Sequence, residues 1–165
     1  MEDIAKEAGL SRQYLYRLVS GREELIEMAM IDRAREFTDE LAARAERLGS
    51  EGELEERFID QVLYSVSLGR EDPEFVKLAG ALPRERTNHA LTASDSPFHG
   101  YTARAFEPLF ARALSEGRLR IDVSVDAMVD WLQGVLALLA GRDDLDDQAE
   151  RRLLREFVLP SLLRA

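Results

Sequence analysis

The sequence contains no cysteine and only two histidines among its 165 residues. Without cysteine, the chain can form neither a disulfide bond nor a thiolate metal site. Neither histidine follows a glutamate at the spacing found in di-iron bundles, and the zinc-binding pattern His-Glu-x-x-His does not occur. The sequence therefore predicts a chain that holds no metal and no other cofactor.

Sequence motifs of catalysis are missing as well. The chain contains no Gly-x-Ser-x-Gly nucleophile elbow and no glycine-rich loop that could cradle a phosphate. A cluster of four aspartates fits a solvated turn that caps the last helix, with a weak cation site as the alternative. These aspartates are Asp143, Asp144, Asp146 and Asp147. We therefore expect a protein that is not an enzyme.

Long hydrophobic runs are absent too. The most apolar segment, residues 123–140, is interrupted by Asp126, Asp130 and Gln133, and no basic-then-apolar leader opens the chain. Hydrophobic residues make up 45% and charged residues 33% of the sequence, which is ordinary for a globular protein. We therefore expect no membrane partner and a cytoplasmic location.

Acidic residues outnumber basic ones by 32 to 22, which gives a formal net charge of -10. The stretch from Ala8 to Arg22 departs from this balance, because it contains three arginines and no acidic residue. An acidic surface repels the phosphates of DNA, whereas a local basic stretch can contact them. We expect any contact with nucleic acid to lie in this stretch.

Residues 3–25 have the spacing of two short helices joined by a tight turn. Ala5 and Ala8 are small enough for the helices to approach closely. Gly9 can adopt the left-handed conformation that ends the first helix, and Ser11 can cap the second. This is the layout of a helix-turn-helix, whose second helix enters the major groove of DNA. The apolar residues expected to share its core are Ile4, Leu10, Leu15 and Leu18.

The outer face of the predicted second helix carries side chains suited to DNA. Arginine attracts phosphates, arginine and glutamine at a helix start can reach base edges, and tyrosine can hydrogen-bond a phosphate. A solvated helix face with a few arginines is the alternative, but the small residues and the apolar spacing favour a DNA-reading element. The predicted DNA-binding residues are Ser11, Arg12, Gln13, Tyr14, Tyr16, Arg17 and Arg22.

Four short patterns follow one another here: Ile-Ala, Ala-Gly-Leu-Ser, Leu-Tyr-Arg and Arg-Glu-Glu-Leu. In this order they resemble the TetR family of bacterial transcription regulators. The resemblance implies that Tyr16 and Arg22 contact phosphates, and that Arg12, Gln13 and Tyr14 lie where bases are read. The matching positions are Ile4, Ala5, Ala8, Gly9, Leu10, Ser11, Leu15, Tyr16, Arg17, Arg22, Glu23, Glu24 and Leu25.

In the TetR family a full helix precedes this helix pair, whereas here the pattern begins two residues after Met1. We therefore expect the natural protein to begin roughly 20 or more residues upstream, given the length of a typical helix and its connection. Truncated material and a protein that has lost DNA binding are the alternatives. The expected organisation is an incomplete helix-turn-helix domain at residues 1–25 and a helical ligand-binding and dimerisation domain at residues 26–165.

No segment alternates apolar and polar residues for long enough to predict a strand, so we expect an all-α fold. Apolar residues at helical spacing predict one long helix over residues 23–47. Residues 84–98 are polar and are expected to form an exposed connection. Capping signals predict the starts of three later helices, at Ser50 with Glu53, at Asp72 with Pro73, and at Ser96 with Pro97.

The last two predicted helices are apolar almost all round, and such a helix needs partners on every face. In a chain of this size the body can cover only one side, so we expect a symmetric four-helix interface with a second copy. The TetR resemblance implies the same homodimer, and a fully internal helix is the alternative. The predicted interface residues are Val129, Leu132, Val135, Leu136, Leu139, Leu154, Phe157 and Val158.

The middle of the chain, residues 54–110, corresponds by resemblance to the region that holds an effector pocket in TetR-type proteins. Ligand pockets are mostly apolar with a few polar groups that orient the ligand. Most aromatic residues of this region are expected to be core. The candidate pocket residues are Phe58, Tyr64, His99, Tyr101, Phe106, Phe110 and Trp131.

These features predict a ligand-responsive transcriptional regulator, with a repressor favoured. It would bind a palindromic operator in double-stranded DNA as a homodimer and be released by a small hydrophobic effector. The alternative is a helical ligand-binding or protein-interaction dimer whose DNA-binding head is vestigial.

Overall fold

The protein is built from helices. The computed structural model describes residues 1–48 and 52–164, and within these ranges no β-strand occurs beyond an isolated bridge between Leu119 and Leu163. The predicted all-α fold is confirmed. In chain order the helices are α1 (Glu2–Glu7), α2 (Arg12–Leu18), α3 (Arg22–Leu48), α4 (Leu54–Glu71), α5 (Pro73–Gly80), α6 (Arg84–Thr92), α7 (Pro97–Ser115), α8 (Val125–Ala140), α9 (Asp147–Leu153), a π-helical turn (Leu154–Val158) and α10 (Leu159–Leu162).

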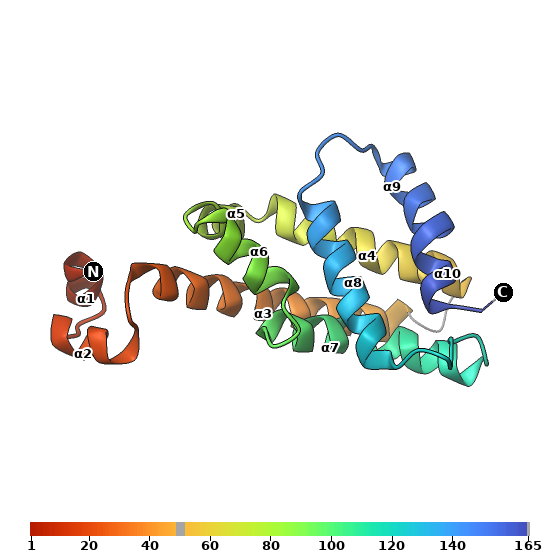
Figure 1. Cartoon of the computed structure of the whole chain (residues 1–165), viewed down its shortest axis with the longest axis horizontal. Coiled ribbons are helices and arrows are strands. Elements are labelled where there is room, and N and C mark those ends of the chain that lie inside the picture. The colour runs from red at the N-terminus through yellow and green to blue at the C-terminus, as the bar shows by residue number, and fades with distance from the viewer. Residues whose placement is uncertain (49–51, 165) are drawn as a thin grey trace.

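The longest element is α3, a helix of 27 residues that runs from α1 and α2 into the rest of the molecule (Figure 1). We call α1 and α2 the head, and we call the rest of the chain, from α3 onward, the body. The long helix predicted over residues 23–47 is confirmed. Its buried residues recur every three or four positions, as expected for one inward-facing stripe. These residues are Met30, Ala34, Thr38, Leu41 and Ala45.

The main hydrophobic core lies in the body, between α4, α7, α8 and the C-terminal helices. Phe58 of α4 is fully buried there, with its ring stacked on Phe106 and edge-on to Phe110, at centroid distances of 6.4 and 5.7 Å. Such aromatic pairs add to the stabilisation that burial of their apolar area provides. The core therefore fixes α4 against α7.

A single buried amide joins three helices of the body. The Nε2 atom of Gln61 in α4 donates to the carbonyl oxygens of Leu41 in α3 and Ala105 in α7, both at 3.0 Å. Arg44 donates to the Oε1 atom of the same amide at 3.4 Å. A buried polar group is tolerated when its hydrogen bonds are satisfied, so Gln61 of α4 holds α3 and α7 together where these two helices pack on each other.

Two of the predicted caps are confirmed. The Asp72 carboxylate accepts from the backbone N–H of Phe75 at 2.7 Å, and the Ser96 hydroxyl accepts from that of Phe98 at 3.3 Å. Each cap is followed by proline at the first helical position, where the missing N–H costs no hydrogen bond. The predicted capping residue Ser50 lies outside the described residues.

The expectation of an exposed connection over residues 84–98 is wrong, because α6 forms there. Ala90 of α6 is buried against Met30 of α3 and Leu82, and Phe98 packs beside them. The remaining α6 residues are largely polar and face outward, so the average hydropathy of the segment is low even though one face is packed. Leu91 adds apolar contact at the cavity, and the Thr87 hydroxyl donates to the Ala79 carbonyl at 3.1 Å, so a few side chains are enough to pack this short helix.

The C-terminal helices pack across α4 (Figure 1). The Nη2 atom of Arg70 in α4 lies 2.5 Å from the Leu139 carbonyl oxygen, 2.6 Å from that of Arg142, and 2.6 Å from the buried Glu150 carboxylate. This arginine therefore ties α4 to both ends of the connection between α8 and α9. Within the described residues, no helix combines the length and the apolar character needed to cross a membrane.

Replacing Asp72 with alanine should lower the free energy of unfolding by about 1–2 kcal/mol, because the α5 cap is lost together with an ion pair. The Arg33 guanidinium bonds the Asp72 carboxylate through two nitrogens and, with the Phe75 N–H, lowers the pKa of that carboxyl. A lowered folded-state pKa means that the stabilisation is complete above the ordinary aspartate value of about 3.9 and is lost as pH falls through the folded-state value. Chemical denaturation of both proteins between neutral and acidic pH measures the effect.

Asp146→Ala is the matched control, because Asp146 caps α9 through the Ala149 N–H at 2.7 Å. The free energy of unfolding should fall less in Asp146→Ala than in Asp72→Ala. If the difference in free energy of unfolding between wild type and Asp72→Ala does not decrease at acidic pH, the stabilising role of the ionised Asp72 carboxylate is contradicted.

Candidate functional site

The head is two short helices held at a fixed turn. Gly9 has φ 65°, a conformation that residues with a side chain rarely adopt, and it ends α1 as predicted. The Leu10 N–H returns to the Ala5 carbonyl at 2.8 Å, which closes the end of the first helix. The Ser11 hydroxyl then accepts from the Tyr14 N–H at 3.1 Å, so the predicted cap of α2 is confirmed.

The head has a small core that differs from the predicted one. Ala5, Leu15 and Val19 are buried, with Met1 and Leu25 packed beside them. Ile4 and Leu18, predicted to share this core, are exposed, Leu18 with 55% of its surface accessible. These two side chains remain exposed because α1 is short and offers only six residues for α2 to pack against. Val19, whose backbone is extended at the end of α2, fills the place expected for Leu18.

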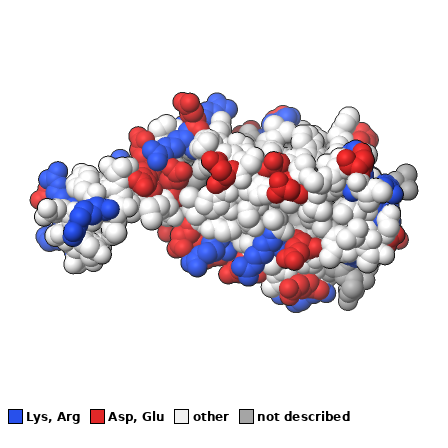
Figure 2. Space-filling model, turned by 60° about the horizontal axis from the view of Figure 1, so that its bottom comes forward, with Lys and Arg blue, Asp and Glu red and all other residues white. Residues whose placement is uncertain are grey.

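All seven residues predicted to contact DNA have exposed side chains on the head or at the start of α3. The Arg12 guanidinium lies 5.6 Å from the centre of the Tyr16 ring, and that of Arg17 lies 5.1 Å from the Tyr14 ring. Stacking on an aromatic face orients an arginine while leaving its N–H groups available. Figure 2 shows Lys and Arg side chains on the head, with acidic atoms at its edge, and mixed charges on the body. This surface can hydrogen-bond an anionic polymer.

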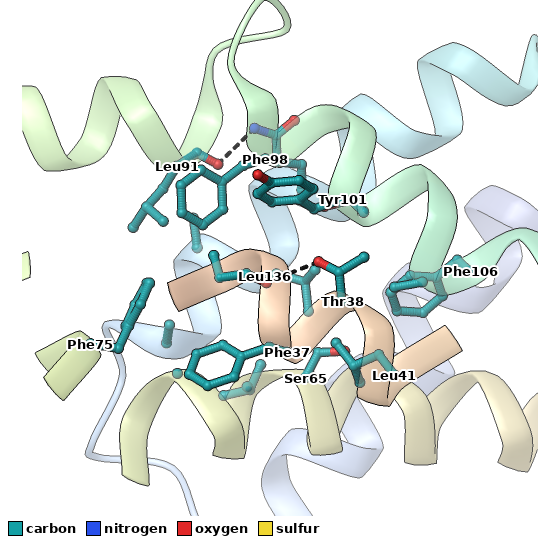
Figure 3. Close-up of a pocket in the computed structure, with 18 residues that line it drawn as sticks. Phe37, Thr38, Leu41, Ser65, Phe75, Leu91, Phe98, Tyr101, Phe106 and Leu136 are labelled. Atoms are coloured by element: carbon teal, nitrogen blue, oxygen red, sulfur yellow. Dashed lines mark hydrogen bonds between the residues drawn. The ribbon is translucent and has the colours of Figure 1, made fainter. Parts of the chain in front are cut away.

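A cavity of about 120 Å³ lies in the body and receives side chains from six helices, α3 to α8. Its walls are mainly aromatic and aliphatic, and Figure 3 shows Phe37, Phe75, Phe98 and Tyr101 bordering the same space. The lining residues are Ala34, Phe37, Thr38, Leu41, Ser65, Val66, Gly69, Phe75, Leu91, Phe98, Tyr101, Thr102, Ala105, Phe106, Gln133, Leu136, Ala137 and Ala140.

The described residues that line the cavity include no acidic or basic side chain. Two of its hydroxyl groups donate within their own helices, Thr38 to the Ala34 carbonyl at 3.0 Å and Ser65 to the Gln61 carbonyl at 2.7 Å. The Gln133 amide nitrogen donates to the Leu91 and Ala93 carbonyls at 2.8 and 3.3 Å. The cavity is therefore suited to an apolar, uncharged molecule.

Two of the seven candidate pocket residues, Tyr101 and Phe106, line this cavity. Phe58 and Phe110 lie in the main core, where each is buried against other rings rather than facing open space. Neither residue lines this cavity. An aromatic residue on a helix does not reveal from sequence whether its neighbours fill the space around it.

The other three candidates lie on or near the surface, away from the cavity. The Tyr64 hydroxyl donates to Glu40, which raises the pKa of the phenol. The His99 Nε2 atom lies 3.4 Å from an Asp130 oxygen, at a polar junction of α7 with α8. Trp131 is 49% exposed on the outer side of α8. None of the three belongs to the cavity lining.

Several lining residues were not foreseen, among them Phe37, Phe75, Leu91 and Phe98. Phe37 was part of the long-helix stripe, and Leu91 and Phe98 fall in the segment expected to be a connection. The sequence feature that could have indicated them is the presence of aromatic residues on several helices that pack against one another. Sequence spacing alone could not show which helices those are.

Most residues predicted for a dimer interface are buried within the single chain. Leu136 lines the cavity, and only Phe157 is widely exposed, at 69%. The prediction is corrected because α8 turns its larger apolar side inward onto α4 and α7, where a partner cannot reach it. The buried residues are Val129, Leu132, Val135, Leu139, Leu154 and Val158.

A narrower apolar surface remains on the outer side of these helices. Trp131 and Leu138 lie two turns apart on α8, and both are about half exposed. Phe157 belongs to the π-helical turn, whose buried residues are Leu154 and Val158. We call Trp131, Leu138 and Phe157 the outer apolar face. Both α8 and the π-helical turn pack on α4, and the large apolar side chains that they leave exposed are available for contact with another protein.

The cavity and the head are connected through the first half of α3. Phe75 and Phe98 line the cavity and also pack beside Met30, the buried α3 residue nearest the head. On the adjacent surface, Arg86 of α6 donates to Glu27 at 2.6 Å and to Glu23 at 3.2 Å. Movement of α5 or α6 would therefore act on the start of α3.

Comparisons with protein-family models, with curated proteins and with solved structures found no match to this chain. Its function is therefore inferred from the geometry of the head, the cavity and the outer apolar face.

Replacing Arg86 with methionine should increase amide hydrogen exchange over residues 23–30, because two contacts that hold the start of α3 to α6 are lost. Hydrogen exchange with mass spectrometry measures this directly. Arg104→Met is the control. Arg104 of α7 pairs with Asp39 of α3 at 2.9 Å, further along α3 than the segment under test. Equal exchange over residues 23–30 in both variants would show that Arg86 does not hold this segment.

Proposed function

We propose that this chain is a ligand-responsive DNA-binding regulator of the TetR type, acting as a homodimer and released from its operator by a small hydrophobic molecule. One observation carries the proposal. The helix that follows the exposed basic surface of α2 is α3, and α3 also supplies Ala34, Phe37, Thr38 and Leu41 to the wall of the cavity. A ligand in the cavity therefore contacts the element that carries the head.

The head supplies the DNA contacts in this proposal. Arg12 and Gln13 stand in the first turn of α2, where a recognition helix meets base edges. Tyr16 and Arg22 fit the phosphate contacts that fix the register of the helix on DNA. The net charge of the chain is -10, whereas the stretch from Ala8 to Arg22 has three arginines and no acidic residue, so in this proposal DNA approaches the α2 side of the head.

The dimer brings two heads onto one palindromic site. The outer apolar face is the surface of each copy that we assign to this contact, and a two-fold axis through it would pair α8 with the C-terminal helices of the partner. Two linked heads bind a palindrome far more tightly than one, because the second contact becomes intramolecular.

Release follows if the ligand prefers a body conformation in which the heads are misplaced for the operator. The shift in population is limited by the difference in ligand affinity between the two conformations. Phe75 and Phe98 contact both the cavity and the Met30 cluster, so filling the cavity changes the packing beneath the start of α3.

A second candidate is a helical ligand-binding or protein-interaction dimer that does not use its head. The observation that favours it is the small core of the head, in which Ile4 and Leu18 are exposed. Such a protein would bind ligand and dimerise without shifting any DNA fragment.

DNA binding is tested with the 165-residue chain and a DNA fragment from the promoter region of the protein's own gene. Affinity should fall steeply as salt rises. Arg12→Ala and Gln13→Ala should weaken binding to the preferred site by about 5- to 150-fold and relax base preference, whereas Tyr16→Phe and Arg22→Ala should weaken all sequences alike. Electrophoretic mobility shift and fluorescence anisotropy measure these effects.

Arg104→Ala, which removes one exposed arginine from the body, is the charge-matched control and should leave DNA affinity unchanged. Absence of DNA binding, or binding that is insensitive to salt, would overturn the regulator and leave the second candidate.

Replacing Trp131 and Phe157 together with glutamate should convert the dimer to a monomer, because two charges would be buried without partners at the contact. Light scattering after size-exclusion chromatography measures the mass in solution. Ile121→Glu is the control, because Ile121 is more exposed than either residue but lies outside the outer apolar face. A wild-type chain that is already monomeric, or a double variant that still dimerises, would contradict this interface.

A further inference from the structure

Four aromatic rings border the cavity, and each of them keeps some accessible surface although the helices pack around it. Phe58, in the main core, is 0% exposed, whereas Phe37, Phe75, Phe98 and Tyr101 are only partly buried. Figure 3 shows these four rings around one space. A molecule in the cavity would cover part of their apolar surface, and removal of such surface from water is favourable.

The arrangement of these rings favours an aromatic ligand over a saturated one. Phe75 of α5 lies between Phe37 of α3 and Phe98 of α7, with ring centroids 5.7 and 6.4 Å apart, and Tyr101 follows at 5.9 Å from Phe98. All three contacts are tilted or edge-on, with interplanar angles of 56–65°. A further aromatic ring can join such a series with the same favourable geometry, which a saturated ring of equal size cannot provide.

Hydrogen bonding contributes little to ligand selection in this cavity. The Thr38 and Ser65 hydroxyls donate to carbonyl oxygens of their own helices. The Gln133 amide nitrogen donates to two backbone carbonyls, and its oxygen is buried. The other polar side chains among the described lining residues are Tyr101 and Thr102, whose hydroxyls can donate or accept and so favour neither kind of ligand group.

The absence of charge in the described lining disfavours an ionised ligand. No acidic or basic side chain occurs among these residues, so a carboxylate or an ammonium group would be buried without a counter-ion. The Arg33 guanidinium lies 5.2 Å from the centre of the Phe37 ring, but it is already paired with Asp72 and Glu36.

The size of the cavity limits the ligand to about one ring. Its volume is about 120 Å³. Engineered apolar cavities of ~150 Å³ bind benzene, so a single ring fits and a fused pair of rings does not.

We propose that the cavity binds a neutral molecule with a single aromatic ring, held by ring contacts and apolar burial rather than by hydrogen bonds or ion pairs. This inference rests on the proposed function, for which it names the chemical class of the effector. Toluene is a simple molecule with these properties.

The first test measures binding of small molecules to the 165-residue chain by NMR titration, without DNA. Toluene, benzoate and benzylammonium share one ring and differ in charge, and naphthalene adds a second ring. Toluene should bind at least about tenfold more tightly than either ion, because a buried charge has no partner here. It should also bind more tightly than naphthalene. No binding of toluene, or equal or tighter binding of any of the other three, overturns the proposal.

The second test asks whether the rings recognise an aromatic ligand. Phe98→Leu removes one ring of the series, and the affinities of toluene and methylcyclohexane are compared in this variant and in the wild type. The ratio of toluene affinity to methylcyclohexane affinity should fall by about 2- to 10-fold, since only toluene loses a ring contact. Comparing ratios cancels the different cost of taking each molecule out of water.

Phe110→Leu is the matched control, because it makes the same change in the main core, where the ring does not line the cavity. Its affinity ratio should equal that of the wild type. A ratio that is unchanged in Phe98→Leu, or that falls equally in both variants, overturns recognition by the cavity rings.

Ala137→Leu locates the binding site without removing a ring, and it decides the matter if Phe98→Leu does not fold. Ala137 lines the cavity and is only partly buried, so a larger side chain there can occupy part of the space. Toluene binding should fall at least about tenfold, while Ala111→Leu, on the exposed side of α7, should leave it unchanged. Unchanged affinity in Ala137→Leu would place the binding site elsewhere and overturn the proposal.

These experiments separate this inference from the proposed function. If toluene binds as expected but leaves the protein–DNA complex unchanged, the ligand class stands and the regulator fails. If benzoate or benzylammonium binds more tightly than toluene and releases DNA, the regulator stands and the ligand class fails.

Discussion

The continuity of α3 is the constraint on which the other features depend. Twenty-seven residues in one helix form a rod about 40 Å long, stiffened by a hydrogen bond at nearly every residue. One end of the rod carries the head, its middle forms a wall of the cavity, and its inner stripe packs on α7. A shift or rotation imposed at any of these places is therefore shared by the whole helix, which makes α3 a mechanical connection as well as a structural one.

The parts of the fold that were predictable from the sequence are those determined within a few residues. Gly9 with its positive φ, Ser11 at the start of α2 and Asp72 before Pro73 each act on the backbone immediately next to them. The length of α3 was predictable for a similar reason, since its apolar stripe repeats without interruption. Local chemistry decides such features, and the rest of the molecule has little influence on them.

The site was less predictable, because it depends on contacts between residues far apart in the chain. Phe58 and Phe37 have similar sequence surroundings, yet the first is enclosed by other rings and the second borders open space. Likewise α8 is apolar on several sides, and only the packed structure separates the residues that face α4 from Trp131 and Leu138. The polar composition of α6 concealed a packed face, because Ala90 and Leu91 are its only apolar residues and both face the body.

Gln61 has a consequence for how this fold can change. By holding α3 and α7 together near Leu41 and Ala105, both of which line the cavity, its amide keeps that part of the wall constant. The opposite part is formed by Phe75 of α5, a helix that contains no buried residue. Substitutions in α5 can therefore reshape one side of the cavity more readily than the side next to Gln61, which the geometry of the body holds in place. Related proteins with different ligands would be expected to diverge first in α5.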